Sequence, residues 1–126
     1  MVATALLVGG CGGSTGTAST LELTAVSVAA EIIASPPDDL VILDIRTPDE
    51  YAAGHIAGAI NIDYYQPDFE AKLSALDPAV PYVMYCNSGN RSANALPLMD
   101  SIGFDEVYEI DGGIQAWYSA GHPVEQ

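Results

Sequence analysis

Two short, continuous apolar runs constrain the fold of this 126-residue chain more than any other feature. They are Leu40–Leu43 and Tyr82–Tyr85, and no charged residue interrupts either. Uninterrupted runs of this length are typical of strands buried on both faces, because a strand with one wet face alternates apolar and polar residues. Such strands occur in parallel sheets, whose connections carry helices onto both faces. The chain is therefore predicted to form one α/β domain with a mostly parallel central sheet flanked by helices on both faces.

The remaining segments alternate between strand and helix patterns, as such a sheet requires. Strands are predicted at Ala59–Ile62, at Val107–Ile110 and, as a strand or an extended arm, at Leu21–Val26. One helix is predicted to run to about Ala34 with Ser27 as its N-cap. Further helices are predicted from Pro67-Asp68 to about Leu76, from Ser92 to Ile102 and from Ile114 to Ala120, with Gly103 and Gly121 closing the last two. Pro97 fits its helix poorly, because proline lacks an N–H, and it should kink that helix or delay its start.

A further short helix is predicted directly after the first apolar run. Thr47 is its N-cap, Pro48 takes the first helical position, and Glu50 completes a capping box with Thr47. Gly54 is predicted to end the helix in the left-handed conformation.

The charged residues around this helix admit two interpretations. In one, Asp44, Arg46 and Glu50 form a catalytic charge set. In the favoured one, Arg46 pairs with Glu50 and braces the end of the strand. Removing either partner then destabilises the end of that strand before it affects chemistry. His55 is likewise either a proton carrier or, as favoured, a hydrogen-bonded structural histidine.

The charge balance excludes two classes of partner. The chain carries 17 acidic residues against three basic ones, for a formal net charge of -14. Such a surface repels nucleic acid and anionic membranes. It is interpreted as a solubilising surface, and it also suits a salty or extracytoplasmic setting. No metal-ligand spacing is present, since the only histidines are His55 and His122, and no cofactor is predicted.

Residues 1–20 differ from the predicted domain at 21–126. Val2–Val8 is apolar but far too short to span a bilayer, and a Gly/Ser/Thr-rich stretch follows Cys11. Leu7–Cys11 resembles a bacterial lipoprotein processing site, which makes Cys11 a lipidation candidate and predicts a cell-envelope protein, periplasmic or lipid-anchored. The first basic residue is Arg46, so either the chain begins inside a longer signal or the match is accidental. In the latter case the segment is an inert flexible leader, and a cytoplasmic location is the alternative.

The second apolar run leads directly into a cysteine. The segment that follows, here called the Cys86 loop, is Cys86-Asn87-Ser88-Gly89-Asn90-Arg91-Ser92. Its backbone N–H groups and the positive end of the next helix are predicted to point at the thiol, an arrangement that holds an anion and favours a thiolate. Arg91 would add a guanidinium fork for an oxyanion, the alternative being a structural ion pair. This interpretation requires inward-pointing amides and a sulfur that a substrate can reach.

Three motifs, in order, resemble the rhodanese homology domain. They are Asp44–Tyr51 followed by Gly54–Asn61, then Tyr85–Ser92, then Gly103-Phe104 with Val107 and Asp111–Trp117. The resemblance covers about Leu21 to Tyr118. It implies a sulfurtransferase in which Cys86 takes sulfane sulfur from a small anionic donor such as thiosulfate, with Asn87 to Ser92 as the cradle of the resulting persulfide. The implied acceptor is cyanide or a thiol, including that of a thioredoxin-like protein.

Two other functions are weighed against this one. Cysteine-based phosphatases and arsenate reductases of this fold resemble a pattern with five residues between cysteine and arginine, whereas this loop has four. A non-catalytic protein-binding or sulfur-carrier rhodanese module usually has the cysteine replaced, and Cys86 is present. Because Asn87, Ser88 and Asn90 are neutral, affinity for thiosulfate is predicted to be low, which leaves room for another sulfane donor.

Overall fold

The computed structural model describes residues 19–126 and contains a five-stranded parallel sheet. The strand order is β2-β6-β5-β3-β4, with every neighbouring pair parallel. The strands are β2 (Thr20–Thr24), β3 (Val41–Asp44), β4 (Ile60–Asn61), β5 (Pro81–Tyr85) and β6 (Glu106–Ile110). The helices are α1 (Val26–Ala34), α2 (Pro48–Ala53), α3 (Phe69–Ser74), α4 (Asn90–Ile102) and α5 (Gly113–Ser119). The predicted α/β architecture is confirmed.

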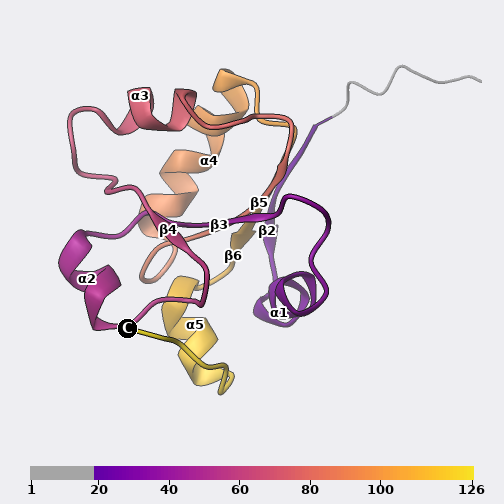
Figure 1. Ribbon diagram of the computed structural model, residues 1–126, viewed down its shortest axis with the longest axis vertical. Coiled ribbons are helices and arrows are strands. Elements are labelled where there is room, and N and C mark those ends of the chain that lie inside the picture. Colours follow the sequence, from indigo (N-terminus) through magenta and orange to yellow (C-terminus); the bar gives the residue numbers. More distant parts are fainter. Residues whose placement is uncertain (1–18) are drawn as a thin grey trace, which may run out of the picture.

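The sheet separates two apolar layers. Figure 1 shows α3 and α4 on one side of the sheet and α1 and α5 on the other. The central strand β5 contributes to both layers, because its alternate side chains point to opposite faces. Tyr82 and Met84 pack with α3 and α4, whereas Val83 and Tyr85 pack with α1 and α5. This two-sided burial explains why β5 is an unbroken apolar run.

Three predicted helix starts are late, by two residues for α1 and α4 and by one for α5, which begins at Gly113. Helix α1 begins at Val26 after Ala25, so Ser27 is not its N-cap. Helix α4 begins at Asn90 rather than Ser92, because the Ala93 N–H already donates to the Gly89 carbonyl at 3.0 Å. Pro97 therefore lies inside α4 and does not delay its start.

The start of α2 contains the predicted capping box. The Glu50 N–H donates to the Thr47 hydroxyl at 3.3 Å, and the Thr47 N–H donates to the Glu50 carboxylate at 3.0 Å. Gly54 ends the helix with φ 157° and ψ 132°, so the predicted left-handed helical conformation is wrong. The chain instead leaves α2 extended, because His55 pairs with Glu125 in an isolated antiparallel bridge.

The predicted leader lies almost wholly outside the described residues. This includes Cys11 and the resemblance to a lipoprotein processing site. Strand β2 begins at Thr20, one residue before the predicted domain boundary. Within residues 19–126, no helix is long and apolar enough to cross a membrane.

The parallel sheet brings the Cys86 loop against the start of α5. The Ile114 N–H donates to the Cys86 carbonyl at 2.9 Å, and the Gln115 N–H donates to the Asn87 carbonyl at 3.1 Å. Gly113 makes this approach possible. Its φ is +61°, and a Cβ there would lie 2.5 Å from the Cys86 oxygen and 2.6 Å from the Asn87 oxygen. These contacts hold the loop carbonyls toward α5.

Gly113→Ala is expected to lower the free energy of unfolding by about 3 kcal/mol, since a left-handed conformation and a backbone clash act together. Gly121→Ala is the matched control. Gly121 also has positive φ (+84°), but a Cβ there meets nothing within 4 Å, so the cost should be about 1 kcal/mol. Urea unfolding measures both, and equal losses would contradict the close-approach argument.

Candidate active site

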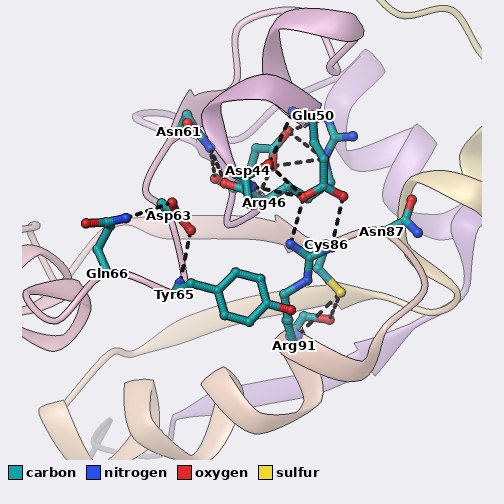
Figure 2. Close-up of polar contacts among 12 residues, drawn as sticks. Asp44, Arg46, Glu50, Asn61, Asp63, Tyr65, Gln66, Cys86, Asn87 and Arg91 are labelled. Carbon is teal, nitrogen blue, oxygen red and sulfur yellow. Dashed lines mark hydrogen bonds and ion pairs between the residues drawn. The ribbon is translucent and has the colours of Figure 1, made fainter.

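Cys86 directly follows β5, and backbone amides of its own loop surround its sulfur. The Gly89 N–H donates to Cys86 Sγ at 3.1 Å, and the Ser92 N–H donates at 3.5 Å. The start of α4 lies within this loop, which adds the partial positive charge of a helix N-terminus. Figure 2 shows the sulfur with its contacts below Glu50 and beside Arg91. The inward amides that the sequence predicted are therefore present at two positions.

The Cys86 side chain is buried, and the residue is only 1% exposed. The sequence interpretation required a sulfur that a substrate can reach, and the structure contradicts this requirement because the sulfur is covered. The Ser92 hydroxyl is one of the groups packed against the sulfur, at 3.4 Å from Sγ. Burial fits an inert thiol as well as an anion site, so the inward amides are the observation that distinguishes the two.

Arg91 lies at the rim and is held by a carboxylate from α2. Its guanidinium donates to both Glu50 carboxylate oxygens, at 2.8 and 3.0 Å (Figure 2). The guanidinium carbon also lies 5.3 Å from the centre of the Tyr65 ring, a cation–π distance. The Arg91 hydrogen bonds lower the pKa of Glu50 from 4.5 to about 2. The predicted Arg46–Glu50 pair is therefore wrong: the partner of Glu50 is Arg91.

Arg46 pairs with Asp44 instead. Its guanidinium donates twice from Nε at 3.1 Å and once from a terminal nitrogen at 2.8 Å, and it also donates to the Gly54 carbonyl at 2.6 Å. Both side chains are buried, so this pair ties the end of β3 to the end of α2. Although burial opposes the charge, the bonds to Asp44 raise the pKa of Arg46. Asp44 and Arg46 brace the rim rather than contact Cys86.

His55 is positioned by hydrogen bonding and stacking away from the sulfur. Its Nδ1 lies 2.8 Å from the Tyr51 carbonyl oxygen, and its ring stacks on the Tyr51 ring at 3.8 Å. Its Nε2 lies 3.5 Å from the Glu125 carboxylate. These are the contacts of a structural histidine that joins α2 to the C-terminus.

The neutral loop residues face outward. Ser88 and Asn90 are exposed, and Asn87 is half-buried with its side-chain oxygen accepting from Gln115 at 2.9 Å. Within residues 19–126, no cluster of three or more His, Cys, Asp or Glu side chains could hold a metal ion.

One residue beneath the loop was missed by the sequence interpretation. Glu109 on β6 is 2% exposed, and its carboxylate accepts a 2.6 Å hydrogen bond from the Ser92 hydroxyl. Burial raises the pKa of Glu109, and the nearby charge of Asp111 acts in the same direction. The available signal was a single acidic residue inside the apolar pattern of Val107–Ile110.

Comparison with known proteins is consistent with this geometry. A model for the rhodanese-like domain matches residues 25–120. A thiosulfate sulfurtransferase GlpE from Pseudomonas fluorescens is 40% identical over 86 residues, which is 68% of this chain and 75% of that protein. The GlpE of Pseudomonas entomophila is 37% identical over 89 residues, 71% of this chain and 80% of that protein.

Solved structures show the same similarity. The rhodanese-related protein from Thermoplasma volcanium superposes with a TM-score of 0.72 at 31% identity, covering 82% of this chain and 97% of that one. A Rhodopseudomonas palustris protein of unknown function, described as a possible tyrosine phosphatase, superposes with a TM-score of 0.68 at 31% identity, covering 83% of this chain and 85% of that one.

Glu50→Gln is expected to destabilise the protein near pH 7 by about 0.5–1 kcal/mol, because the charged pair with Arg91 is lost while the amide can still serve the capping box. Folding depresses the Glu50 pKa from 4.5 to about 2, so this stabilisation is complete above pH 4.5 and disappears as the pH falls toward 2. The difference between wild type and variant should shrink over that interval.

Urea unfolding at a series of pH values measures this difference. Asp49→Asn is the matched control, since Asp49 is the other acidic residue in the first turn of α2. A Glu50→Gln difference that does not change with pH, or that Asp49→Asn reproduces, would contradict the assignment.

Proposed function

The chain belongs to the rhodanese-like domain family, and we propose that it is a sulfurtransferase that carries sulfane sulfur on Cys86. The two amides directed at Cys86 Sγ carry this proposal. A thiolate and a persulfide are both anions, so the same donors stabilise the attacking group and the intermediate. The GlpE relatives, which are named as thiosulfate sulfurtransferases, support the same reaction class.

The proposed reaction is a double displacement. The Cys86 sulfur attacks the outer sulfur of thiosulfate, the S–S bond of the donor breaks, and sulfite leaves. A second nucleophile, a thiol or cyanide, then attacks the outer sulfur of the Cys86 persulfide and regenerates the free cysteine. The thiol of a thioredoxin-like protein is one proposed acceptor.

A dianionic donor can bind although the chain carries a formal net charge of -14. The Cys86 loop amides act at hydrogen-bond distance, whereas charges more than about 8–10 Å away are largely screened at moderate salt. Arg91 lies at the edge of the Cys86 loop. Its hydrogen bonds to Glu50 are the main reason that its pKa is raised, so its guanidinium stays cationic. We propose that Arg91 contributes to binding the sulfonate end of the donor.

The buried sulfur adds one requirement. Because Cys86 is 1% exposed, a donor must displace side chains at the rim before it reaches Sγ. Exposed Tyr65 and the half-buried Arg91 are the groups whose movement we propose to admit it.

The phosphatase alternative fits this loop less well. Four residues separate Cys86 from Arg91, and the sulfur already lies 3.1 Å from the Gly89 nitrogen. Because the ring is one residue shorter than in the phosphatase pattern, we infer that it accommodates a second sulfur atom more readily than a phosphoryl group with its ester. Because the similar Rhodopseudomonas palustris protein is described as a possible tyrosine phosphatase, hydrolysis of a phosphate ester is the test of this alternative.

Treatment with thiosulfate is expected to add the mass of one sulfur atom to the Cys86 peptide, with release of sulfite in a single turnover. Cys86→Ser should show neither, because a hydroxyl cannot form the persulfide. Mass spectrometry of the digested protein and a sulfite assay measure the two events. Cys11→Ser is the control and should retain both. Absence of the adduct, with sulfite release unchanged in Cys86→Ser, would refute the proposal.

Arg91→Gln is expected to raise KM for thiosulfate about tenfold or more with a smaller change in kcat, because a charge-assisted hydrogen bond to the donor is lost. Steady-state kinetics with thiosulfate measures both constants. Glu50→Gln is the matched control, since it breaks the same ion pair but keeps the guanidinium. An equal rise of KM in both variants would show that the ion pair, and not the guanidinium, matters.

A further inference from the structure

A chain of hydrogen bonds runs from the sulfur into the sheet. The Cys86 thiol lies 3.4 Å from the Ser92 hydroxyl, which lies 2.6 Å from the Glu109 carboxylate. All three residues are buried, and Glu109 is 2% exposed. Ser92 stands on α4 and Glu109 on the neighbouring strand β6, so the connection depends on the packing of the helix on the sheet.

Among the groups packed against Glu109 on the α4 side of the sheet, the Ser92 hydroxyl is the one that forms a hydrogen bond with its carboxylate. Strands β2 and β5 place Leu23 and Met84 beside it, and neither titrates. Helix α4 presents the Ser92 hydroxyl, while its Arg91 is turned to Glu50 on α2. The segment after β6 carries Asp111, whose negative charge makes ionisation of Glu109 harder.

The hydroxyl of Ser92 has one proton and two acceptors within reach. Besides Glu109, the Gly89 carbonyl lies 3.3 Å away. The shorter contact to the carboxylate is the stronger one while Glu109 is ionised, because bonds to charged acceptors are shorter and stronger. When Glu109 is protonated it can donate to Ser92, and Ser92 is then free to donate to a sulfur anion. Cys86, Ser92 and Glu109 can therefore stabilise one negative charge either on the sulfur or on the Glu109 carboxylate.

We infer that Cys86, Ser92 and Glu109 share one proton and hold a single negative charge, which lies on Glu109 in the free protein and on sulfur in the persulfide. Two charges in this buried cluster would repel each other, so the sulfur ionises by passing its proton inward. Glu109 acts through Ser92 and is thus a positioning residue. The inference rests on the proposed sulfur transfer for the persulfide state, but not for the free protein.

The step balances during loading from thiosulfate. The S–H bond of Cys86 breaks as an O–H bond forms at Ser92, and the original Ser92 proton passes to the Glu109 carboxylate. The sulfur attacks the outer sulfur of thiosulfate, and the electron pair of the broken S–S bond leaves on sulfite. The outer sulfur stays on Cys86 as the persulfide anion. No proton reaches solvent, and the protein needs no added oxidant or reductant.

The test is the pH dependence of Cys86 alkylation by iodoacetamide, read by mass spectrometry on the Cys86 peptide so that Cys11 does not contribute. In Glu109→Gln the rate should rise about tenfold per pH unit up to a single pKa. In the wild type it should rise, become flat once Glu109 ionises, and rise again at higher pH. Across the flat interval the ratio of the two rates should grow, and it should reach about tenfold one pH unit above the start of that interval. At acid pH the two rates should coincide.

Glu106→Gln on the same strand is the matched control and should follow the wild type. Profiles of wild type and Glu109→Gln that differ by one constant factor at every pH, as a displaced loop would give, overturn the inference. So does a Glu106→Gln profile that changes as much as that of Glu109→Gln.

Proton release gives a second readout that does not depend on how fast a reagent reaches the sulfur. Within the flat interval, a pH indicator in weak buffer should record one more proton per persulfide for Glu109→Gln than for the wild type. Equal release overturns the shared proton. If thiosulfate loads neither protein, the proposed function fails, and the alkylation profiles still decide whether the proton is shared.

Discussion

The backbone contact between the Cys86 loop and the first turn of α5 determines the geometry at the sulfur. The carbonyls of Cys86 and Asn87 accept hydrogen bonds from α5. In a trans peptide the C=O and the following N–H point in opposite directions, so the N–H groups of Asn87 and Ser88 are turned away from α5. The loop then continues with the Gly89 and Ser92 amides directed at Sγ. A side chain at Gly113 would prevent the contact, so a glycine far along the sequence controls the environment of the thiol.

The sequence predicted the order of the elements and the capping box of α2, misplaced the starts of α1, α4 and α5 and the conformation of Gly54, and missed the pairing of residues far apart in the chain. The capping box of Thr47 and Glu50 spans three residues, and an unbroken apolar run identifies a two-sided strand, so both could be predicted. The partner of Glu50 could not, since Arg46 is four residues away and Arg91 is 41. The packing of α2 beside the Cys86 loop determines that Glu50 pairs with the guanidinium of Arg91 and not with that of Arg46. The role of Glu109 was not predicted for the same reason, because its hydrogen-bond partner Ser92 belongs to another element.

The pairing of the cations affects how an anion can be recognised. All three basic residues have a carboxylate partner: Arg46 with Asp44, Arg91 with Glu50, and Lys72 with Asp68 at 3.6 Å. The Arg91 fork gives two of its hydrogen bonds to Glu50, and a guanidinium has five N–H donors. Under the proposed function, a donor anion binds through the remaining hydrogens or competes with Glu50. Under the proposed function, the uncharged backbone amides directed at Sγ add to this attraction.

A buried carboxylate beneath a nucleophilic thiol looks unfavourable, since like charges disfavour each other's ionised form. The arrangement is reasonable if the site never holds two charges. On the inference above, the thiol keeps its proton while Glu109 is ionised, and the sulfur is also covered, since Cys86 is 1% exposed. In the proposed reaction the charge moves to sulfur as the donor reacts, and the proton that leaves Cys86 is replaced, through Ser92, by one held on Glu109. In the proposed cycle, the acceptor reaction that returns a free cysteine recovers that proton along the same path through Ser92.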